Sequence, residues 1–265
     1  MVGCGDVSVV HLDALQRSGA AELVGVCEVD PATAAVVGER LGVPAFTDHR
    51  RLLAEVCPDV VHVCTPHDQH APVLLDALQA GAHVLTEKPL AHTLAAGLEV
   101  VEVAARHPEL KVGVCFQNRY NAPVVAARRL LASGELGAVL GGSAAVLWRR
   151  TADYYRARPW RGDRARSGGG VLINQAIHTV DLVRWLVGEV TDVRGDIGHY
   201  GTETPEIDVE DTAQLVLQHG PGVCTLFTAS SLNVVDAPVE VVVHTERAVL
   251  RLLGDLTSSS VGVYP

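Results

Sequence analysis

The sequence predicts an α/β fold in two domains: a parallel sheet with intervening helices over residues 1–118, then an α/β domain with a mostly antiparallel open sheet over 119–265. Three observations support this prediction. Short valine-rich runs alternate with longer amphipathic segments in the first half. Alternating, β-branched segments dominate the end of the chain. A length of 265 residues with 48% hydrophobic content can supply two cores.

In the first domain, the glycine turn comes at the third residue, so almost no first strand precedes it. Pro31 suits a first helical turn, and Gly42 stands where a helix ends. The apolar runs predict strands at 23–27, 60–64, 83–85 and 112–115. The amphipathic runs predict helices at 7–17, Pro31–Leu41, His49–Val56, 71–80 and 93–106.

The second domain begins with a helix at Ala122–Ala132 and continues with a strongly apolar helix at 171–186, which Gly188 ends. Alternation then predicts antiparallel strands at Thr212–Gln218, 222–230, 239–244 and 248–253. The chain stops at Tyr264-Pro265 with no further strand or helix. We expect the chain to be a fragment, truncated at the C-terminus and recorded from too late a start.

Charge and composition exclude several classes of function. A net charge of −10 repels nucleic acid and anionic membranes, and no apolar run is long enough for a membrane helix. No leader sequence is present, so we expect a cytoplasmic protein. The six cysteines stand in apolar stretches without a CxxC pair, which favours buried free thiols. His67 and His70 lack a thiolate partner nearby, so no metal is expected.

A turn suited to a dinucleotide opens the chain. Gly3 permits a tight turn, Gly5 lets backbone approach a pyrophosphate, and Asp6 and Val7 lead into the first helix with Ser8 at the third glycine position. Such a turn alone is unspecific. Glu28, at the end of the second strand, can accept hydrogen bonds from ribose hydroxyls and repels a 2′-phosphate, so NAD is preferred over NADP.

The tripeptide Glu87-Lys88-Pro89 follows the strand at 83–85, at the carboxyl edge where open α/β sheets bind ligands. Partial burial there would lower the pKa of Lys88 enough for proton relay. The alternative is an ordinary surface ion pair between Glu87 and Lys88. Position alone leaves both interpretations open.

A second group of polar residues follows three glycines at 168–170. Asn174, His178 and Asp181 are spaced at i, i+4 and i+7, so they share one face of the predicted helix. Burying such a stripe is costly unless its polar groups have partners or a function. A single histidine is more often a satisfied core residue, but its two polar neighbours favour a functional role.

Together these residues resemble the Gfo/Idh/MocA family, the glucose–fructose oxidoreductase and inositol dehydrogenase group. The matching segments, in chain order, are residues 2–5 with His11, Thr65-Pro66 with His70, Glu87-Lys88-Pro89, 117–120, 154–162, 168–181 and 210–212. The resemblance implies a Rossmann domain and a C-terminal domain whose open sheet joins subunits in a dimer or tetramer. It also implies hydride transfer between nicotinamide C4 and a carbinol carbon of a sugar, cyclitol or related polyol.

The resemblance also implies roles for particular residues. His178 would be the general acid/base, and Lys88 would orient and polarise the substrate oxygen. The cofactor would be lined by Thr65, Pro66, His70, Glu87 and Gln117. Arg119, Tyr120, Trp160, Arg161 and Asp181 would face the nicotinamide or the substrate.

One departure from the family pattern concerns the proton transfer. Many members have aspartate where this chain has Asn174, and an amide positions a hydroxyl without stabilising an imidazolium by charge. The division of proton transfer between Lys88 and His178 is therefore open. Two other classes compete: a non-catalytic NAD-binding sensor or truncated pseudoenzyme, and a metal-dependent hydrolase. The sequence names neither the substrate nor the direction of the reaction.

Overall fold

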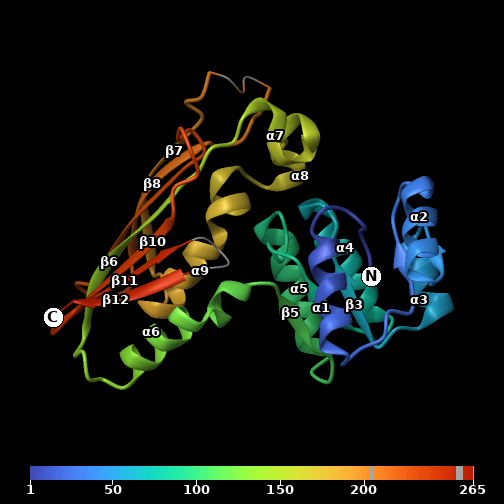
Figure 1. Ribbon diagram of the computed structural model, residues 1–265, viewed down its shortest axis with the longest axis horizontal. Coiled ribbons are helices and arrows are strands. Elements are labelled where there is room, and N and C mark those ends of the chain that lie inside the picture. Colours follow the sequence, from blue (N-terminus) through green and yellow to red (C-terminus); the bar gives the residue numbers. More distant parts are fainter. Residues whose placement is uncertain (203, 205, 255–258, 265) are drawn as a thin grey trace. The chain divides into compact units, whose positions relative to one another are not determined.

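The computed structural model describes residues 1–202, 204, 206–254 and 259–264, and it forms two compact units (Figure 1). Unit 1 is Met1–Cys115 and unit 2 is Phe116–Pro265. The division lies three residues before the expected boundary, so Gln117 and Asn118 belong to unit 2. Each unit has its own hydrophobic core and is described separately below.

Unit 1 contains a parallel sheet in which Val2 takes the place of a whole strand. Val2 forms parallel bridges to both Cys27 and Val63 and so joins two groups of strands. The groups are β2–β1 and β3–β4–β5, with bounds β1 Val26–Cys27, β2 Ala45–Phe46, β3 Val60–Val63, β4 His83–Thr86 and β5 Val112–Val114. The predicted strand at 23–27 is too long, because only its last two residues pair, and β2 was not predicted.

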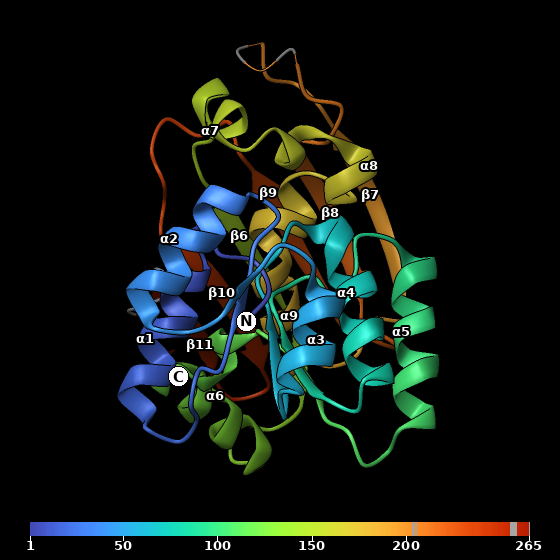
Figure 2. The ribbon, with the colours of Figure 1, turned by 90° about the vertical axis from the view of Figure 1, so that its right-hand side faces the viewer.

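The helices of unit 1 are α1 Ser8–Ser18, α2 Pro31–Leu41, α3 His49–Val56, α4 His67–Gln79 and α5 Leu94–Arg106. Side chains of Asp30, Asp48 and Thr93 accept hydrogen bonds from first-turn amides and fix the starts of α2, α3 and α5. Helix α4 begins four residues earlier than predicted. It lies beside α5 (Figure 2) and contributes the fully buried Leu74 to the core.

Unit 2 is built on a seven-stranded sheet with the order β12-β11-β10-β6-β9-β8-β7. Among the described strands, β6 and β9 form its one parallel pair. The bounds are β6 Val139–Leu147, β7 Asp192–Gly198, β8 Thr212–Gln218, β9 Cys224–Ser230, β10 Val239–Thr245, β11 Val249–Gly254 and β12 Ser259–Tyr264. The four predicted strands are present, with ends shifted by two residues or fewer, whereas β6, β7 and β12 were not predicted.

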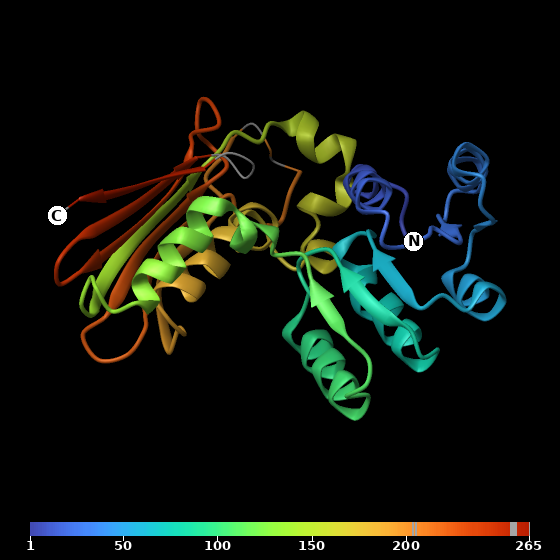
Figure 3. The same ribbon diagram turned by 60° about the horizontal axis from the view of Figure 1, so that its bottom comes forward.

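Two helices cover one face of this sheet (Figure 3): α6 Ala122–Ala132 contacts β11 and β12, and α9 Ile177–Leu186 contacts β6 and β10. Phe227 and Leu250 are buried on the sheet strands in the unit 2 core. Because side chains alternate along a strand, Leu226 points to the other face, where it is 60% exposed. The sheet of unit 2 is therefore open on one side, as expected from the resemblance.

The sequence predicts one continuous α-helix at 171–186, and this prediction is wrong. Residues Leu172–Ala176 form a π-helical turn, and α9 begins at Ile177. Four short helices were not predicted: η1 Gln117–Tyr120, α7 Ala152–Ala157, η2 Pro159–Gly162 and α8 Arg164–Ser167. In the described ranges, no helix combines the length and apolar character needed to span a bilayer.

The expectation of six buried thiols is only partly correct. All six cysteines are free, but Cys57 is exposed at the end of α3, and Cys27 and Cys64 alone are fully buried. Cys57 takes a left-handed backbone conformation that ends the helix.

Candidate functional site

The two glycines of the turn in unit 1 differ in how closely other atoms approach them. A Cβ on Gly3 would stand 2.6 Å from the backbone of Cys64, so the turn packs directly on the end of β3. A Cβ on Gly5 would meet nothing within 4 Å. Val7, at the N-cap of α1, offers no side-chain acceptor to the first-turn amides. The amide end of α1 is thus suited to an anion such as a pyrophosphate.

The carboxylate of Glu28 lies against this turn, since its Oε2 accepts a hydrogen bond of 2.9 Å from the backbone N–H of Cys4. Glu28 directly follows β1, where the turn and the sheet edge meet. Asp6 is exposed and Val7 half-buried on the other side of the turn. An acid held in this way can present its second oxygen to a ribose hydroxyl.

The Glu87-Lys88-Pro89 tripeptide follows β4 and is anchored through Glu87. The backbone N–H of Glu87 donates to Val63 O at 2.9 Å, and Oε2 accepts from the backbone N–H of Lys88 at 3.2 Å. Oε1 lies 3.1 Å from Nε2 of His11 on α1. Burial raises the pKa of Glu87, but the contact with His11 and the charge of Lys88 outweigh it and leave the pKa below its usual value. Glu87 is therefore an ionised, fixed carboxylate.

His11 also contacts His62 of β3, with 3.0 Å between the two Nδ1 atoms. Burial, together with the charge of His11, lowers the pKa of His62 to about 4. A neutral His62 can exchange donor and acceptor roles with His11 according to its tautomer. His62, His11 and Glu87 thus form a hydrogen-bonded row that ends at the residue before Lys88.

Potential ligand atoms of His11, Glu87 and Cys115 all lie within 4.8 Å of one another. Burial, followed by the charge of Glu87, raises the pKa of the Cys115 thiol to about 12. A protonated thiol can donate a hydrogen bond to the Glu87 carboxylate. Cys115 and His11 therefore both support the position of that carboxylate.

His70 links the two loops that follow β3 and β4. Its Nδ1 lies 2.6 Å from Pro89 O and its Nε2 lies 2.9 Å from Thr65 O. Burial lowers the pKa of His70 against the opposing effect of these two carbonyls. The side chain is 1% exposed. Through its two contacts it connects the Thr65-Pro66 loop with the tripeptide loop.

In unit 2, the buried Glu210 fixes the start of the segment that carries His178. Its Oε2 accepts from Gly170 N at 2.8 Å and its Oε1 from Leu172 N at 3.1 Å. A Cβ on Gly170 would lie 1.8 Å from Glu210 O, so the backbone approach requires glycine. Gly170 therefore admits the backbone of Glu210 beside the start of this helix.

Asn174, His178 and Asp181 do not form a single α-helical stripe, because Asn174 lies in the π-helical turn. Asp181 is buried and accepts from Arg119 Nε at 2.7 Å, while Nη2 of Arg119 donates to its other oxygen. His178 is 5% exposed and lies edge-on to Phe116, with ring centroids 5.9 Å apart. Asn174 is half-buried. π-turns of this kind are frequent at functional sites.

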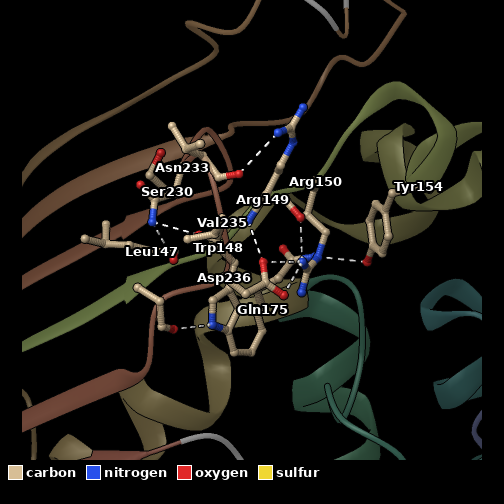
Figure 4. Close-up of polar contacts among 12 residues, drawn as sticks. Leu147, Trp148, Arg149, Arg150, Tyr154, Gln175, Ser230, Asn233, Val235 and Asp236 are labelled. Atoms are coloured by element: carbon tan, nitrogen blue, oxygen red, sulfur yellow. Dashed lines mark hydrogen bonds and ion pairs between the residues drawn. The ribbon is translucent and has the colours of Figure 1, made fainter.

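A further polar cluster surrounds Tyr154 of α7 (Figure 4). Gln175 Nε2 donates to the Tyr154 hydroxyl at 2.9 Å, and the guanidinium groups of Arg150 and Arg161 lie 5.3 and 4.4 Å from the tyrosine ring centroid. Arg150 also pairs with Asp236 at 3.1 Å. Gln175 and Arg150 were not among the predicted site residues. The position of Gln175 directly after Asn174 could have indicated it.

The predicted residues thus fall into two groups. Unit 1 brings together the glycine turn with Glu28, and the Thr65, His70 and Glu87 loops around Lys88. Unit 2 pairs Arg119 with Asp181 and places half-buried Trp160 and Arg161 near Tyr154. Tyr120 is 84% exposed, and Gln117 lies at the start of η1. Lys88 and His178 belong to separate units.

Comparison with known families covers almost the whole chain. Residues 1–116 match an oxidoreductase family with an NAD-binding Rossmann fold, and residues 124–251 match the GFO/IDH/MocA C-terminal domain. The two matches correspond to the two units described above. The chain belongs to the Gfo/Idh/MocA family.

Three relatives illustrate the range of the family. Inositol 2-dehydrogenase of Rubrobacter xylanophilus is 33% identical over 193 residues, covering 71% of this chain and 52% of the relative. Levoglucosan dehydrogenase of Pseudarthrobacter phenanthrenivorans is 29% identical over 68% of this chain and 46% of its own. The chain spans about half the length of these two relatives. The WlbA dehydrogenase of Bordetella pertussis, solved with NADH and UDP-GlcNAcA, is 28% identical with a TM-score of 0.91, over 99% of this chain and 81% of that structure.

Proposed function

We propose that this protein is an NAD-dependent dehydrogenase or reductase that transfers a hydride between nicotinamide C4 and a carbinol or carbonyl carbon of a sugar, cyclitol or related polyol. The observation that carries the proposal is the anchoring of Lys88. Glu87, the residue before it, is fixed by His11 and by β3 at the carboxyl edge of a parallel sheet. Ligands bind at that edge in open α/β sheets.

The residues of unit 1 fit a dinucleotide. The uncrowded face of Gly5 and the amide end of α1 suit a pyrophosphate, and Glu28 suits the adenosine ribose. Thr65 and Pro66 form the neighbouring loop, and His70 of α4 contacts it. When bound, the nicotinamide supplies the acceptor or donor of the hydride. The carboxylate of Glu28 would repel a 2′-phosphate, which supports NAD over NADP.

The remaining chemistry falls to Lys88, His178 and Asn174. The Lys88 ammonium would donate a hydrogen bond to the substrate oxygen and orient it. His178 would take the hydroxyl proton during oxidation and return it during reduction. The amide of Asn174 would position a hydroxyl without adding charge. Because no carboxylate stands at position 174, Lys88 would carry a larger share of the electrostatic stabilisation.

We further propose that two copies of the chain associate through the open face of the unit 2 sheet and that the protein works in the cytoplasm. Exposed Leu226 and Val216 lie side by side on that face, paired across β8 and β9. An exposed apolar pair on an open sheet face favours contact with a second copy of the chain. Six free cysteines are consistent with a reducing compartment.

The test is NADH formation from a panel of sugars, cyclitols and polyols by the wild-type chain and by Lys88→Ala. We expect the variant to lose at least about 100-fold in kcat/KM, as removal of a polarising donor typically does. Lys111, the only other lysine in the chain, is exposed and provides the matched control Lys111→Ala. Full activity in Lys88→Ala would refute the assignment. Tight NADH binding without any turnover would favour a sensor.

A further inference from the structure

Three side chains with atoms that can bind a metal ion lie together in unit 1. His11 of α1, Glu87 after β4 and Cys115 after β5 each offer one such atom, and these atoms all lie within 4.8 Å of one another. In the described part of the chain, no other group of three such residues lies so close. The three residues are far apart in the sequence, so spacing along the chain could not indicate them.

The parallel sheet fixes the backbone of two of these residues. Strands β4 and β5 are in register up to Thr86 and Val114, so the residues that follow them leave the same sheet edge. These residues are Glu87 and Cys115, and the backbone N–H of Cys115 donates to Thr86 O at 2.9 Å. Nε2 of His11 lies 3.1 Å from Oε1 of Glu87. Bonds of about 2.0–2.3 Å to a tetrahedral Zn²⁺ place ligand atoms roughly 3.3–3.7 Å apart, which is close to this arrangement.

The three kinds of ligand atom select the cation. Zn²⁺ binds imidazole nitrogen, carboxylate oxygen and thiolate sulfur, whereas Mg²⁺ and Ca²⁺ prefer oxygen alone. Three protein ligands leave a fourth position of the tetrahedron for water. The side chains of His11 and Glu87 are 7% and 15% exposed, so a cation from the solvent can reach them.

His62 supports His11 from the other side of the imidazole ring. The two Nδ1 atoms lie 3.0 Å apart, and Nε2 of His11 faces Glu87. A histidine that binds a metal through Nε2 keeps its N–H at Nδ1 and usually donates it to a second residue, which orients the ring. Burial, together with the charge of His11, lowers the pKa of His62 to about 4, so its neutral ring can accept this hydrogen bond.

A bound cation would change the charge beside Lys88. In the free protein, burial and then the charge of Glu87 raise the pKa of Cys115 to about 12, so the thiol is protonated. A divalent cation opposes both effects, and a coordinated thiol releases its proton to the solvent. The two charges of the cation are then balanced by the thiolate and the carboxylate. The Lys88 ammonium, which interacts with the charge of Glu87 in the free protein, loses that negative neighbour.

We propose that His11, Glu87 and Cys115 form a binding site for one Zn²⁺ ion. The bound ion inhibits the protein, because it neutralises the carboxylate that precedes Lys88. It takes no part in hydride transfer. The binding site depends on unit 1 alone, whereas the inhibition rests on the proposed function, in which Lys88 acts on the substrate.

Binding is measured by titrating the reduced, metal-free chain. Competition with a chromophoric chelator counts Zn²⁺, and Cd²⁺ reports the thiolate through the ultraviolet absorption of a cadmium–sulfur bond. We expect one Zn²⁺ per chain and a cadmium–thiolate band that Zn²⁺ abolishes. Mg²⁺ and Ca²⁺ at the same concentration should leave that band unchanged. No saturable binding of Zn²⁺, or displacement of Cd²⁺ by Mg²⁺, would overturn the proposed site.

Variants locate the bound ion. Cys115→Ser should remove the cadmium–thiolate band and weaken Zn²⁺ binding about 100-fold or more, and His62→Gln should weaken it about 10-fold. The matched control is Cys57→Ser, because Cys57 is an exposed thiol and should not affect binding. Circular dichroism checks that each variant is folded, and Glu87→Gln provides a second ligand variant if Cys115→Ser is not. Unchanged affinity in the folded ligand variant, or loss of binding in Cys57→Ser, would refute the site.

Turnover tests the inhibition separately. With a sugar or polyol that the chain oxidises, saturating Zn²⁺ should lower kcat/KM about 10-fold or more, and a chelator should restore it. Each variant is compared with its own activity without zinc, and Cys115→Ser should be insensitive at the concentration that inhibits the wild type. Full turnover with Zn²⁺ bound would refute the inhibition. If Zn²⁺ binds as expected but the metal-free chain oxidises no sugar, the metal site stands and the proposed function fails.

Discussion

The Nε2 atom of His11 lies 3.1 Å from Oε1 of Glu87, so a side chain on α1 fixes the carboxylate that precedes Lys88. The two residues are 76 positions apart in the chain. Their contact ties the helix that follows the glycine turn to the loop that carries the proposed catalytic lysine. The contact between His11 and Glu87 therefore links the glycine turn to Lys88 within unit 1.

His11→Ala should lower the free energy of unfolding at pH 7 by about 1–3 kcal/mol, because it leaves the largely buried Glu87 carboxylate without its partner. Glu87 has a lowered pKa, so its contribution is fully present above the ordinary value of 4.5 and is lost as the pH falls through the folded-state pKa. Urea unfolding at several pH values measures the difference between variant and wild type. A difference that is constant down to pH 3 would mean that His11 acts through packing alone.

His62 should make the protein less stable in mild acid. Its pKa falls from 6.5 to about 4 on folding, so below pH 6.5 the unfolded chain binds a proton that the folded chain does not. We expect stability to decline by roughly 2–3 kcal/mol between pH 6.5 and pH 4 from this residue. His62→Gln keeps hydrogen-bonding groups but does not titrate. An unchanged pH dependence in this variant would refute the assignment.

The ion pair between Arg119 and Asp181 should be essential to unit 2. In Asp181→Asn, the Arg119 guanidinium faces a neutral amide in place of a buried carboxylate. We expect the free energy of unfolding to fall by about 3 kcal/mol. The exposed pair of Arg184 and Glu189 is the matched control, and Glu189→Gln should cost less than about 1 kcal/mol. Thermal and urea unfolding measure both. Equal effects of the two substitutions would show that burial of the first pair is unimportant.

Gly170→Ala should disrupt the start of the His178 segment, because the added Cβ would lie 1.8 Å from the backbone oxygen of Glu210. We expect a loss of more than about 3 kcal/mol, or failure of unit 2 to fold. Gly97, inside α5, has only ordinary contacts within 4 Å, and Gly97→Ala should stabilise the protein by roughly 0.5–1 kcal/mol. A Gly170→Ala protein as stable as wild type would contradict the structure.

Much of the fold could be predicted because hydrophobic periodicity and capping residues are local. Helices α2, α3 and α6 have the expected bounds, and the residues between their ends carry the pattern themselves. Strand β6 was missed because its Gly141-Gly142 and alanines are typical of a loop. It forms a strand because β9 and β10 pair with it from both sides, and a Cβ on Gly142 would stand 2.3 Å from Val242 O.

Only part of the candidate site could be predicted from the sequence. Motif residues such as Lys88 and His178 could be named, but their supporting partners come from distant parts of the chain. The partner of Glu87 is 76 residues away, that of Asp181 is 62 and that of Gly170 is 40. Nothing local marks these contacts. The π-turn was missed for a related reason, since its residues have an ordinary helical sequence pattern.

The parallel pairing of β6 with β9 has a consequence for how this protein can change. Two parallel strands cannot be joined by a hairpin, so the chain must make a long excursion between them. Tyr154 and the His178 helix both lie on that excursion, between Leu147 and Cys224. We expect insertions or replacements there to change the surroundings of Tyr154 and His178 while the pairing of β6 with β9 keeps its register.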